Sequence, residues 1–295
     1  MKICSTSKMS VVESFIYNQH DDSLCRCETI EGPPNSGNIG PRIVTPQHDF
    51  IPFIIAQQEI WNTFQTQQSF CLPSCLLSEY TIWDMTNEKL ACDSDWSKRI
   101  LIWFTEIVKF FFNESKFMTH SCRSERWKTL EKSNSIWEKS LPPEITPLFT
   151  QETDPKKGIL FPVIWYKSSC QAITAQHIQL SRMLLAMSNP NISFMGLNAR
   201  SEFLSMEKNI CHFLRGLIGL ALSNPKCPVV SINAAIGIFV GGGYLTAFEE
   251  QKAVLEFLID LEFRCAWSTK TIIEALEGVW WKNTSHLSGL YGHFG

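Results

Sequence analysis

The sequence lacks a hydrophobic run long enough to cross a membrane. Its most apolar stretch, Ile100–Phe112, is interrupted by Glu106 and Lys109, whereas a transmembrane helix needs about 20 largely apolar residues. The opening residues MKICSTSKMSVVES also lack the apolar segment of a secretory signal peptide. We therefore expect a soluble protein that has no membrane partner.

An excess of positive charge is also missing. The 295 residues include 26 Lys and Arg against 29 Asp and Glu, which gives a formal net charge of −3. Within residues 1–45 the basic residues are only Lys2, Lys8, Arg26 and Arg42. Because phosphate contacts require clustered Lys and Arg, the chain is not expected to grip DNA by itself.

Cysteines at the spacing of a zinc site are absent as well. The 11 cysteines are scattered, and their close pairs are Cys25-Arg-Cys27 and Cys71-Leu-Pro-Ser-Cys75. Neither pair is C-x-x-C, and no second pair follows at the distance that tetrahedral zinc sites use. An odd, irregular set predicts reduced intracellular thiols, several of them in the core. We predict no metal ligands and no cofactor in this chain.

The glycine-rich segment GIFVGGG does not complete a nucleotide-binding motif. Gly237 and Gly242 have the separation of a P-loop, but Gly243 stands where the motif requires lysine. A dinucleotide pattern starting at Gly241 fails because Thr246 replaces its third glycine. A turn or a close helix crossing is the expected role of these glycines.

Catalytic motifs such as G-x-S-x-G and H-E-x-x-H are not present. His177 and Cys170 lie two turns apart on one predicted helix, too far for a direct hydrogen-bonded pair. His212 follows Cys211 and points in another direction. We therefore predict a non-enzyme with no catalytic or binding residues, in which His177 is a hydrogen-bonded core residue. A helical enzyme using His177 or a cysteine is the least favoured alternative.

Helical periodicity dominates the remaining sequence. The stretch Phe161–Met187 predicts a long central helix of about 35 to 40 Å, stopped by Ser188-Asn189-Pro190. Its expected inward stripe contains six residues at alternating steps of three and four: Cys170, Ile173, His177, Leu180, Leu184 and Met187. Gln171, Gln179 and Arg182 are expected mostly off this face. Such a helix suits the interior of a bundle.

Similar patterns predict the other elements. Helices are expected in groups within 50–80 and over 96–112, 123–141, 202–222, 229–240, 246–265 and 268–282. A strand remains an alternative for 229–240. Thr246 followed by Glu249 predicts a capping box, and the prolines between 142 and 147 predict an extended connector followed by a polar loop over 150–158. The fold class is an all-α, irregular helical array. It has a disordered leader or linker (1–45), one helical domain (46–282) and a flexible tail (283–295).

Several segments resemble the regulatory domain of fungal zinc-cluster (Zn2Cys6-type) transcription factors. That family shows a helix with two tryptophans, a P-P-x-F-x-P connector, a P-x-I/V-W segment, an F-V-A-G segment, and a G-W-x-T segment before a final helix that ends with tryptophan. The matching residues are Arg126-Trp127-x-x-Leu130, Trp137, Pro142-Pro143-x-x-x-Pro147, Pro162-Val-Ile-Trp165, Phe239-Val240-Gly-Gly242, Glu262, Trp267-Ser-Thr269, Leu276 and Trp280.

The resemblance covers roughly Asp95 to Trp281 and implies a helical regulatory domain in the nucleus that controls transcription. Family members often govern metabolic or secondary-metabolite gene clusters. Two positions depart from the pattern, because Ala266 stands where glycine is usual and Gly241 where alanine is usual. Partners implied are the transcription machinery or another zinc-cluster regulator, and a small-molecule effector and a dimer are compatible with the family. We expect such an effector between the central helix and the helix over 202–222.

The six-cysteine zinc finger of that family is not found in this sequence. Zinc and sequence-specific DNA contact would therefore need a finger encoded on an upstream exon, or a partner protein. Two alternatives follow: a regulatory domain belonging to a factor with such a finger, or a finger-less helical interaction protein that modulates a full-length regulator.

Overall fold

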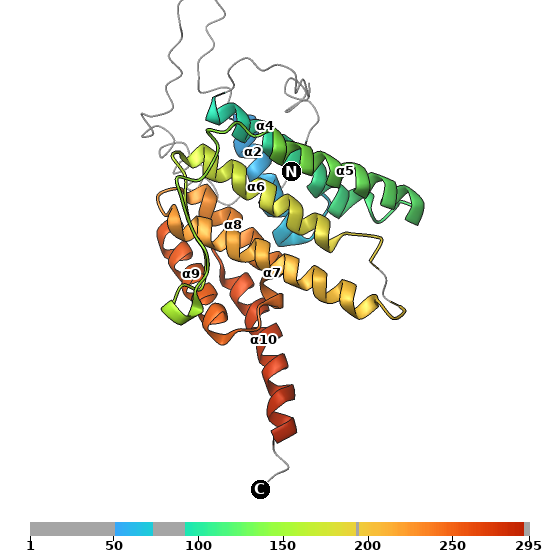
Figure 1. Cartoon of the computed structure of the whole chain (residues 1–295), viewed down its shortest axis with the longest axis vertical. Helices are drawn as coiled ribbons and strands as arrows, with labels where there is room; N and C mark the ends of the chain where they lie inside the picture. The colour runs from blue at the N-terminus through green and yellow to red at the C-terminus, as the bar shows by residue number, and fades with distance from the viewer. Residues whose placement is uncertain (1–50, 73–91, 193–194, 292–295) are drawn as a thin grey trace, which may run out of the picture.

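The computed structural model describes residues 51–72, 92–192 and 195–291, with side chains for all but 51–52 and 281–291 (Figure 1). The predicted leader over 1–45 and the apolar group around Tyr80 lie outside the described residues. Within the described ranges the chain is mostly helical, as the periodicity predicted. The helices are α2 (Ile51–Thr66), α4 (Asp93–Lys109), α5 (His120–Ser140), α6 (Ser169–Met187), α7 (Ala199–Ser223), α8 (Pro228–Gly241), α9 (Phe248–Cys265) and α10 (Lys270–Tyr291).

The central helix α6 is shorter than predicted. It begins at Ser169 and has 19 residues, which corresponds to a length of about 28 Å. The Ser168 side chain caps its first turn by accepting a hydrogen bond from the Gln171 N–H at 3.3 Å. The prediction of a helix from Phe161 was wrong because the segment after Pro162 is extended. The predicted stop is confirmed, since α6 ends at Met187 and Ser188 is its C-cap.

α6 is buried on nearly every side. It packs against α4, α5, α7 and α8, and Leu180 and Leu184 have no exposed surface. Gln171 was expected mostly off the inward face, yet it is 1% exposed because its Nε2 donates to the Glu144 carbonyl at 3.0 Å. The apolar stripe was therefore predicted correctly, but burial continues around the helix.

Two short strands replace parts of the predicted loop and of the predicted central helix. β1 (Phe149–Gln151) pairs antiparallel with β2 (Val163–Trp165), in a register that sets Phe149 opposite Trp165. Each strand has three residues, too few to show an alternating pattern in the sequence. The pair is held to the helices because the Ile164 N–H donates to Ser223 Oγ at 3.0 Å.

The glycine-rich segment is a close helix crossing, as the sequence indicated. Gly237 lies inside α8, which confirms helix rather than strand for this region. A Cβ atom on Gly237 would lie 2.7 Å from Leu217 Cδ1, and one on Gly242 would lie 2.7 Å from Leu276 Cδ2. A leucine methyl would have to move to admit a Cβ at either position. α7 therefore packs closely on α8 at Gly237, and α10 packs closely on Gly242, just after α8.

Both helices at the C-terminal end depart from their predicted limits. α9 begins at Phe248 after Ala247, without a capping side chain, so the predicted capping box at Thr246 was wrong. α10 remains helical to Tyr291, beyond the predicted boundary at residue 282, and projects from the other helices in Figure 1. Among the described residues, no helix combines the length and the apolarity needed to span a bilayer.

Candidate functional site

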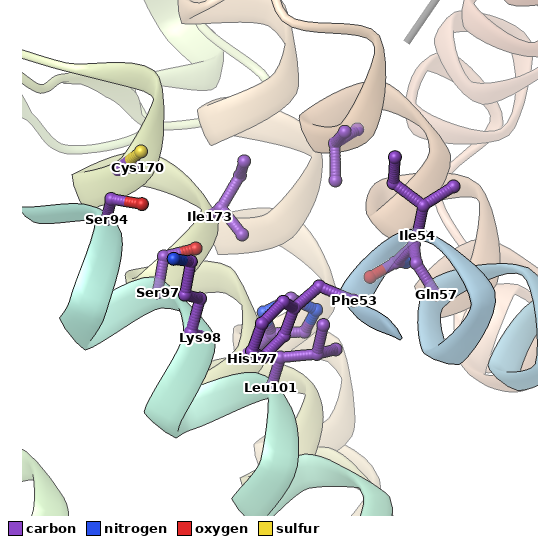
Figure 2. Close-up of a pocket in the computed structure, with 11 residues that line it drawn as sticks. Phe53, Ile54, Gln57, Ser94, Ser97, Lys98, Leu101, Cys170, Ile173 and His177 are labelled. Atoms are coloured by element: carbon purple, nitrogen blue, oxygen red, sulfur yellow. The ribbon is translucent and has the colours of Figure 1, made fainter. Parts of the chain in front are cut away.

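A small cavity lies where four helices begin, with a volume of about 50 Å³. Figure 2 shows side chains from α2, α4 and α6 converging around it. α2, α4, α6 and α8 each contribute residues from their first turns, and α2, α4 and α6 add residues from their second or third turns. The lining consists of Phe53, Ile54, Gln57, Ser94, Ser97, Lys98, Leu101, Cys170, Ile173, His177 and Val229. The cavity therefore combines apolar walls with a few convergent polar groups.

His177 is the most buried polar group of the cavity. Its side chain is 1% exposed, and its ring centroid lies 5.3 Å from that of Phe104. Desolvation by burial lowers the pKa of His177 to about 3, so the imidazole is neutral near pH 7. Among the described residues, the His177 Nδ1 atom has no hydrogen-bond partner. A buried ring nitrogen without a partner is unusual in a native protein.

A chain of amide contacts reaches this imidazole. Gln57 Nε2 donates to Asn233 Oδ1 at 2.8 Å. The Asn233 amide nitrogen lies 3.4 Å from His177 Nε2. The network joins α2, α8 and α6.

Lys98 brings a positive charge to the lining of the cavity. Its Nζ atom lies 5.5 Å from the Phe53 ring centroid. The first turns of α6 and α8 contain no acidic residue, whereas that of α4 contains Asp93 and Asp95. Helix N-termini carry partial positive charge, which these two carboxylates oppose at α4.

Acidic residues do occur in the first turn of α4. Asp93 Oδ2 accepts from Ser168 Oγ at 2.7 Å, and Asp95 Oδ2 accepts from the Cys92 N–H at 3.2 Å. Both carboxylates therefore serve local hydrogen bonds at helix starts, and neither lines the cavity.

The residues weighed for catalysis lie in different places. His177 and Cys170 line the same cavity. Cys211 lies on α7, where its Sγ donates to the Tyr244 carbonyl at 3.4 Å and burial raises the pKa of its thiol. His212 is exposed on α7, with its ring centroid 5.6 Å from that of Phe213.

The location of the cavity differs from the predicted effector site. α6 contributes three lining residues and α7 contributes none. The effector site between α6 and α7 stays a prediction. Sequence reasoning missed Gln57 and Asn233, which lie 176 positions apart in the chain. Neither belongs to a local pattern that could have identified it.

Metal ligands do not cluster in the part of the chain that the structure describes: no group of three or more His, Cys, Asp or Glu could hold an ion there. Cys71 is exposed, whereas Cys25, Cys27 and Cys75 lie outside the described residues. Searches of protein-family models, curated proteins and solved structures found no match to this chain. The resemblance to zinc-cluster regulators therefore rests on the residues quoted above.

Proposed function

We propose that this chain is a helical regulatory domain of a fungal zinc-cluster-type transcription factor. It acts in the nucleus by protein contacts through its helices and not by catalysis. In this proposal the chain has the irregular helical array of that regulatory domain and a disordered N-terminal leader. Its partner is the transcription machinery or another zinc-cluster regulator.

The observation that carries the proposal is the backbone at Ala266. This residue ends α9 in the left-handed conformation, with φ of 51° and ψ of 33°. Glycine adopts that conformation without the steric cost that a Cβ atom introduces. The family pattern has glycine at this position. The backbone of Ala266 therefore has the conformation that the family's glycine would favour. This agreement supports the register of the resemblance near the C-terminus.

Other motif residues join helices across the core. Trp127 Nε1 donates to the Leu185 carbonyl at 2.8 Å, and Trp280 Nε1 donates to the Gly242 carbonyl at 3.1 Å. Glu262 accepts from the N–H and Oγ1 of Thr269 at 3.0 and 2.9 Å, which fixes the turn between α9 and α10. The motifs thus have structural roles, as expected of a family signature that marks a fold and not an active site.

A surface suited to protein contact lies on α9. The α9 stripe, defined as Phe248, Ile259 and Phe263, is 72%, 60% and 90% exposed. These residues fall on one face of the helix, opposite buried Val254 and Leu258. Large apolar side chains gathered on a surface mark interaction sites.

Charges beside the α9 stripe are largely paired within the helix. Lys252 Nζ lies 3.9 Å from Glu256 Oε1, and Arg264 Nε donates to Asp260 Oδ2 at 2.6 Å. The apolar side chains of the stripe are therefore what a partner helix would cover.

A tethering experiment tests the proposal. The full chain is fused to an unrelated DNA-binding domain and assayed on a fungal reporter gene. We expect the fusion to change reporter output. Ile259→Glu combined with Phe263→Glu should remove most of that effect, because charges in the stripe prevent apolar contact. Phe117→Glu is the matched control, since Phe117 is 89% exposed but lies away from α9. A fusion without any effect on the reporter would contradict the proposal.

The finger-less interaction protein remains the second candidate, and the same α9 stripe favours it. In that case the chain acts only when a full-length regulator is present, and it should co-purify with that regulator through the stripe. Sequencing the 5′ end of the transcript separates the two. An in-frame cysteine-rich exon supports the first candidate, and its absence supports the second. The enzyme hypothesis for His177 or a cysteine stays untested.

A further inference from the structure

We infer that residues 67–72, which follow α2, form a strap that opens and closes as one unit while the helices stay packed. The side-chain amide of Asn113 holds this strap in its closed position. The inference concerns a conformational device and does not depend on the proposed role in transcription. It rests on the turn at Gln67, on two hydrogen bonds from Asn113, and on the burial of Phe70.

The strap begins where the backbone turns out of α2. α2 ends at Thr66, and Gln67 has a left-handed backbone with φ of 54°. The Gln67 Nε2 atom donates to the Phe64 carbonyl at 2.8 Å, close to the end of the helix. A left-handed residue is a common way for a helix to end. The turn therefore belongs to α2, whereas the residues beyond it depend on contacts with other parts of the chain.

Asn113 supplies the polar contacts of the strap. Its Oδ1 accepts from the Phe70 N–H at 2.8 Å, and its Nδ2 donates to the Phe70 carbonyl, also at 2.8 Å. A side-chain amide has the donor and the acceptor needed to pair with both groups of one backbone residue. Asn113 lies in a π-helical turn (Phe110–Glu114) at the end of α4, and such turns often occur at functional positions. Loss of this side chain would remove both hydrogen bonds at once.

Little apolar surface of the strap is buried. Phe70 is 4% exposed and belongs to the same core cluster as Phe64 and Phe112, and Leu72 is partly buried against that cluster. The other strap residues are exposed: Gln67, Gln68, Ser69 and Cys71. Segments with few buried apolar contacts open at a lower free energy than the core does. The strap should therefore open without unfolding the helices, which uncovers apolar surface and releases the Asn113 amide.

Amide hydrogen exchange of the full chain, followed by NMR, tests the strap in the folded protein. The two reporters are the Phe70 N–H, which donates to Asn113, and the Cys71 N–H, which donates to Glu59 Oε1 at 3.2 Å. Leu184 in α6 is the core reference, with 0% exposure. In the wild type, the two reporters should have similar protection factors, at least about tenfold below that of Leu184.

Asn113→Ala should raise the exchange rates of both reporters by about tenfold, because the closed strap loses two hydrogen bonds. The rise at Cys71 is the decisive readout, since its own acceptor is unchanged in this variant. The exchange rate of Leu184 should stay as in the wild type. Asn62→Ala is the matched control, because the Asn62 side chain bonds within α2, and it should leave both reporters unchanged.

Several results would overturn the strap. In the wild type, the contrary result is a protection of Phe70 and Cys71 equal to that of Leu184. In Asn113→Ala, it is a rise that is absent or confined to Phe70, or one that is equally large at Leu184. The same acceleration in Asn62→Ala would refute the role of Asn113. If Asn113→Ala does not fold, the wild-type comparison decides by itself.

Discussion

The helices α6 and α9 both depart from the usual burial of apolar residues and exposure of polar ones. α6 carries Gln176, His177 and Ser181 in the interior, all at 1% exposure or less. α9 carries Ile259 and Phe263 on the surface at 60% and 90% exposure. The difference follows from location, because α6 is surrounded by four helices whereas α9 packs mainly on α8.

The two helices differ in what their unusual residues contact. In α6, Gln176 Nε2 donates to the Val230 and Leu217 carbonyls at 2.8 and 3.3 Å, which ties α6 to α8 and α7. Ser181 Oγ, by contrast, has no hydrogen-bond partner among the described residues. In α9, Ile259 and Phe263 leave most of their surface exposed. The Gln176 amide therefore stabilises this fold, while the exposed apolar groups of α9 suit contact with another molecule.

The largest expected difference between the two helices comes from placing the same charge in each. Leu180→Asp puts an unpaired carboxylate where the wild-type side chain has 0% exposure. It should lower the free energy of unfolding by about 4 kcal/mol or more and unfold the domain. Ile259→Asp on α9 should change it by less than about 0.5 kcal/mol. Thermal melting followed by circular dichroism measures both, and similar melting of the two variants would refute the assigned core face.

Two glycine substitutions should change stability by smaller amounts. One contacts the segment that precedes α6, and the other lies in the segment that precedes α9. A Cβ on Gly219 would lie 2.1 Å from the Pro162 carbonyl oxygen, and one on Gly243 would lie 3.6 Å from Val279 Cγ1. Gly219→Ala should cost about 3 kcal/mol because backbone must move. Gly243→Ala should stabilise by about 0.5 kcal/mol through the unfolded chain. Urea unfolding compares them, and a neutral Gly219→Ala would mean that the contact is looser.

The buried imidazole of α6 predicts a pH dependence of stability. Because the pKa of His177 falls to about 3 in the folded protein, from an ordinary value of 6.5, the unfolded chain binds more protons between these values. Stability should therefore decrease as the pH falls below about 6.5, by about 2 kcal/mol between pH 7 and pH 5.

Urea unfolding of the wild type and His177→Gln at several pH values measures this contribution. The wild type should lose about 2 kcal/mol more than the variant between pH 7 and pH 5. His212→Gln is the control for the loss of an exposed histidine. Equal losses in the wild type and His177→Gln would show that the pKa of His177 is the same in the folded and unfolded protein.

The smallest expected change in stability comes from substitutions in α9 and at its C-terminal end. Ala266→Gly removes the Cβ from a left-handed residue with φ of 51° and should stabilise the protein by about 1 kcal/mol. Ala253→Gly, inside the same helix, should destabilise it by about 1 kcal/mol. Opposite signs in thermal melting are the expected result, and destabilisation by both substitutions would argue against the left-handed end of α9.

Local sequence patterns predicted the helices whose apolar residues recur along one face. The stripe through Leu180 and Leu184 located α6, and Asn224-Pro225 located the end of α7. The start of α6 was missed because apolar residues continue into β2, which periodicity alone does not separate from helix. The cavity was beyond prediction, since Gln57 reaches Asn233 only after the chain has folded.

The contact between Trp61 and the motif residue Trp267 can form only late in synthesis. The indole rings of Trp61 in α2 and Trp267 after α9 lie with their centroids 3.7 Å apart. At elongation rates of roughly 5–20 residues per second, α2 would wait about 10–40 seconds on the ribosome before Trp267 is made. During that interval Trp61 lacks its ring partner, although α4, which also packs on α2, has already been made.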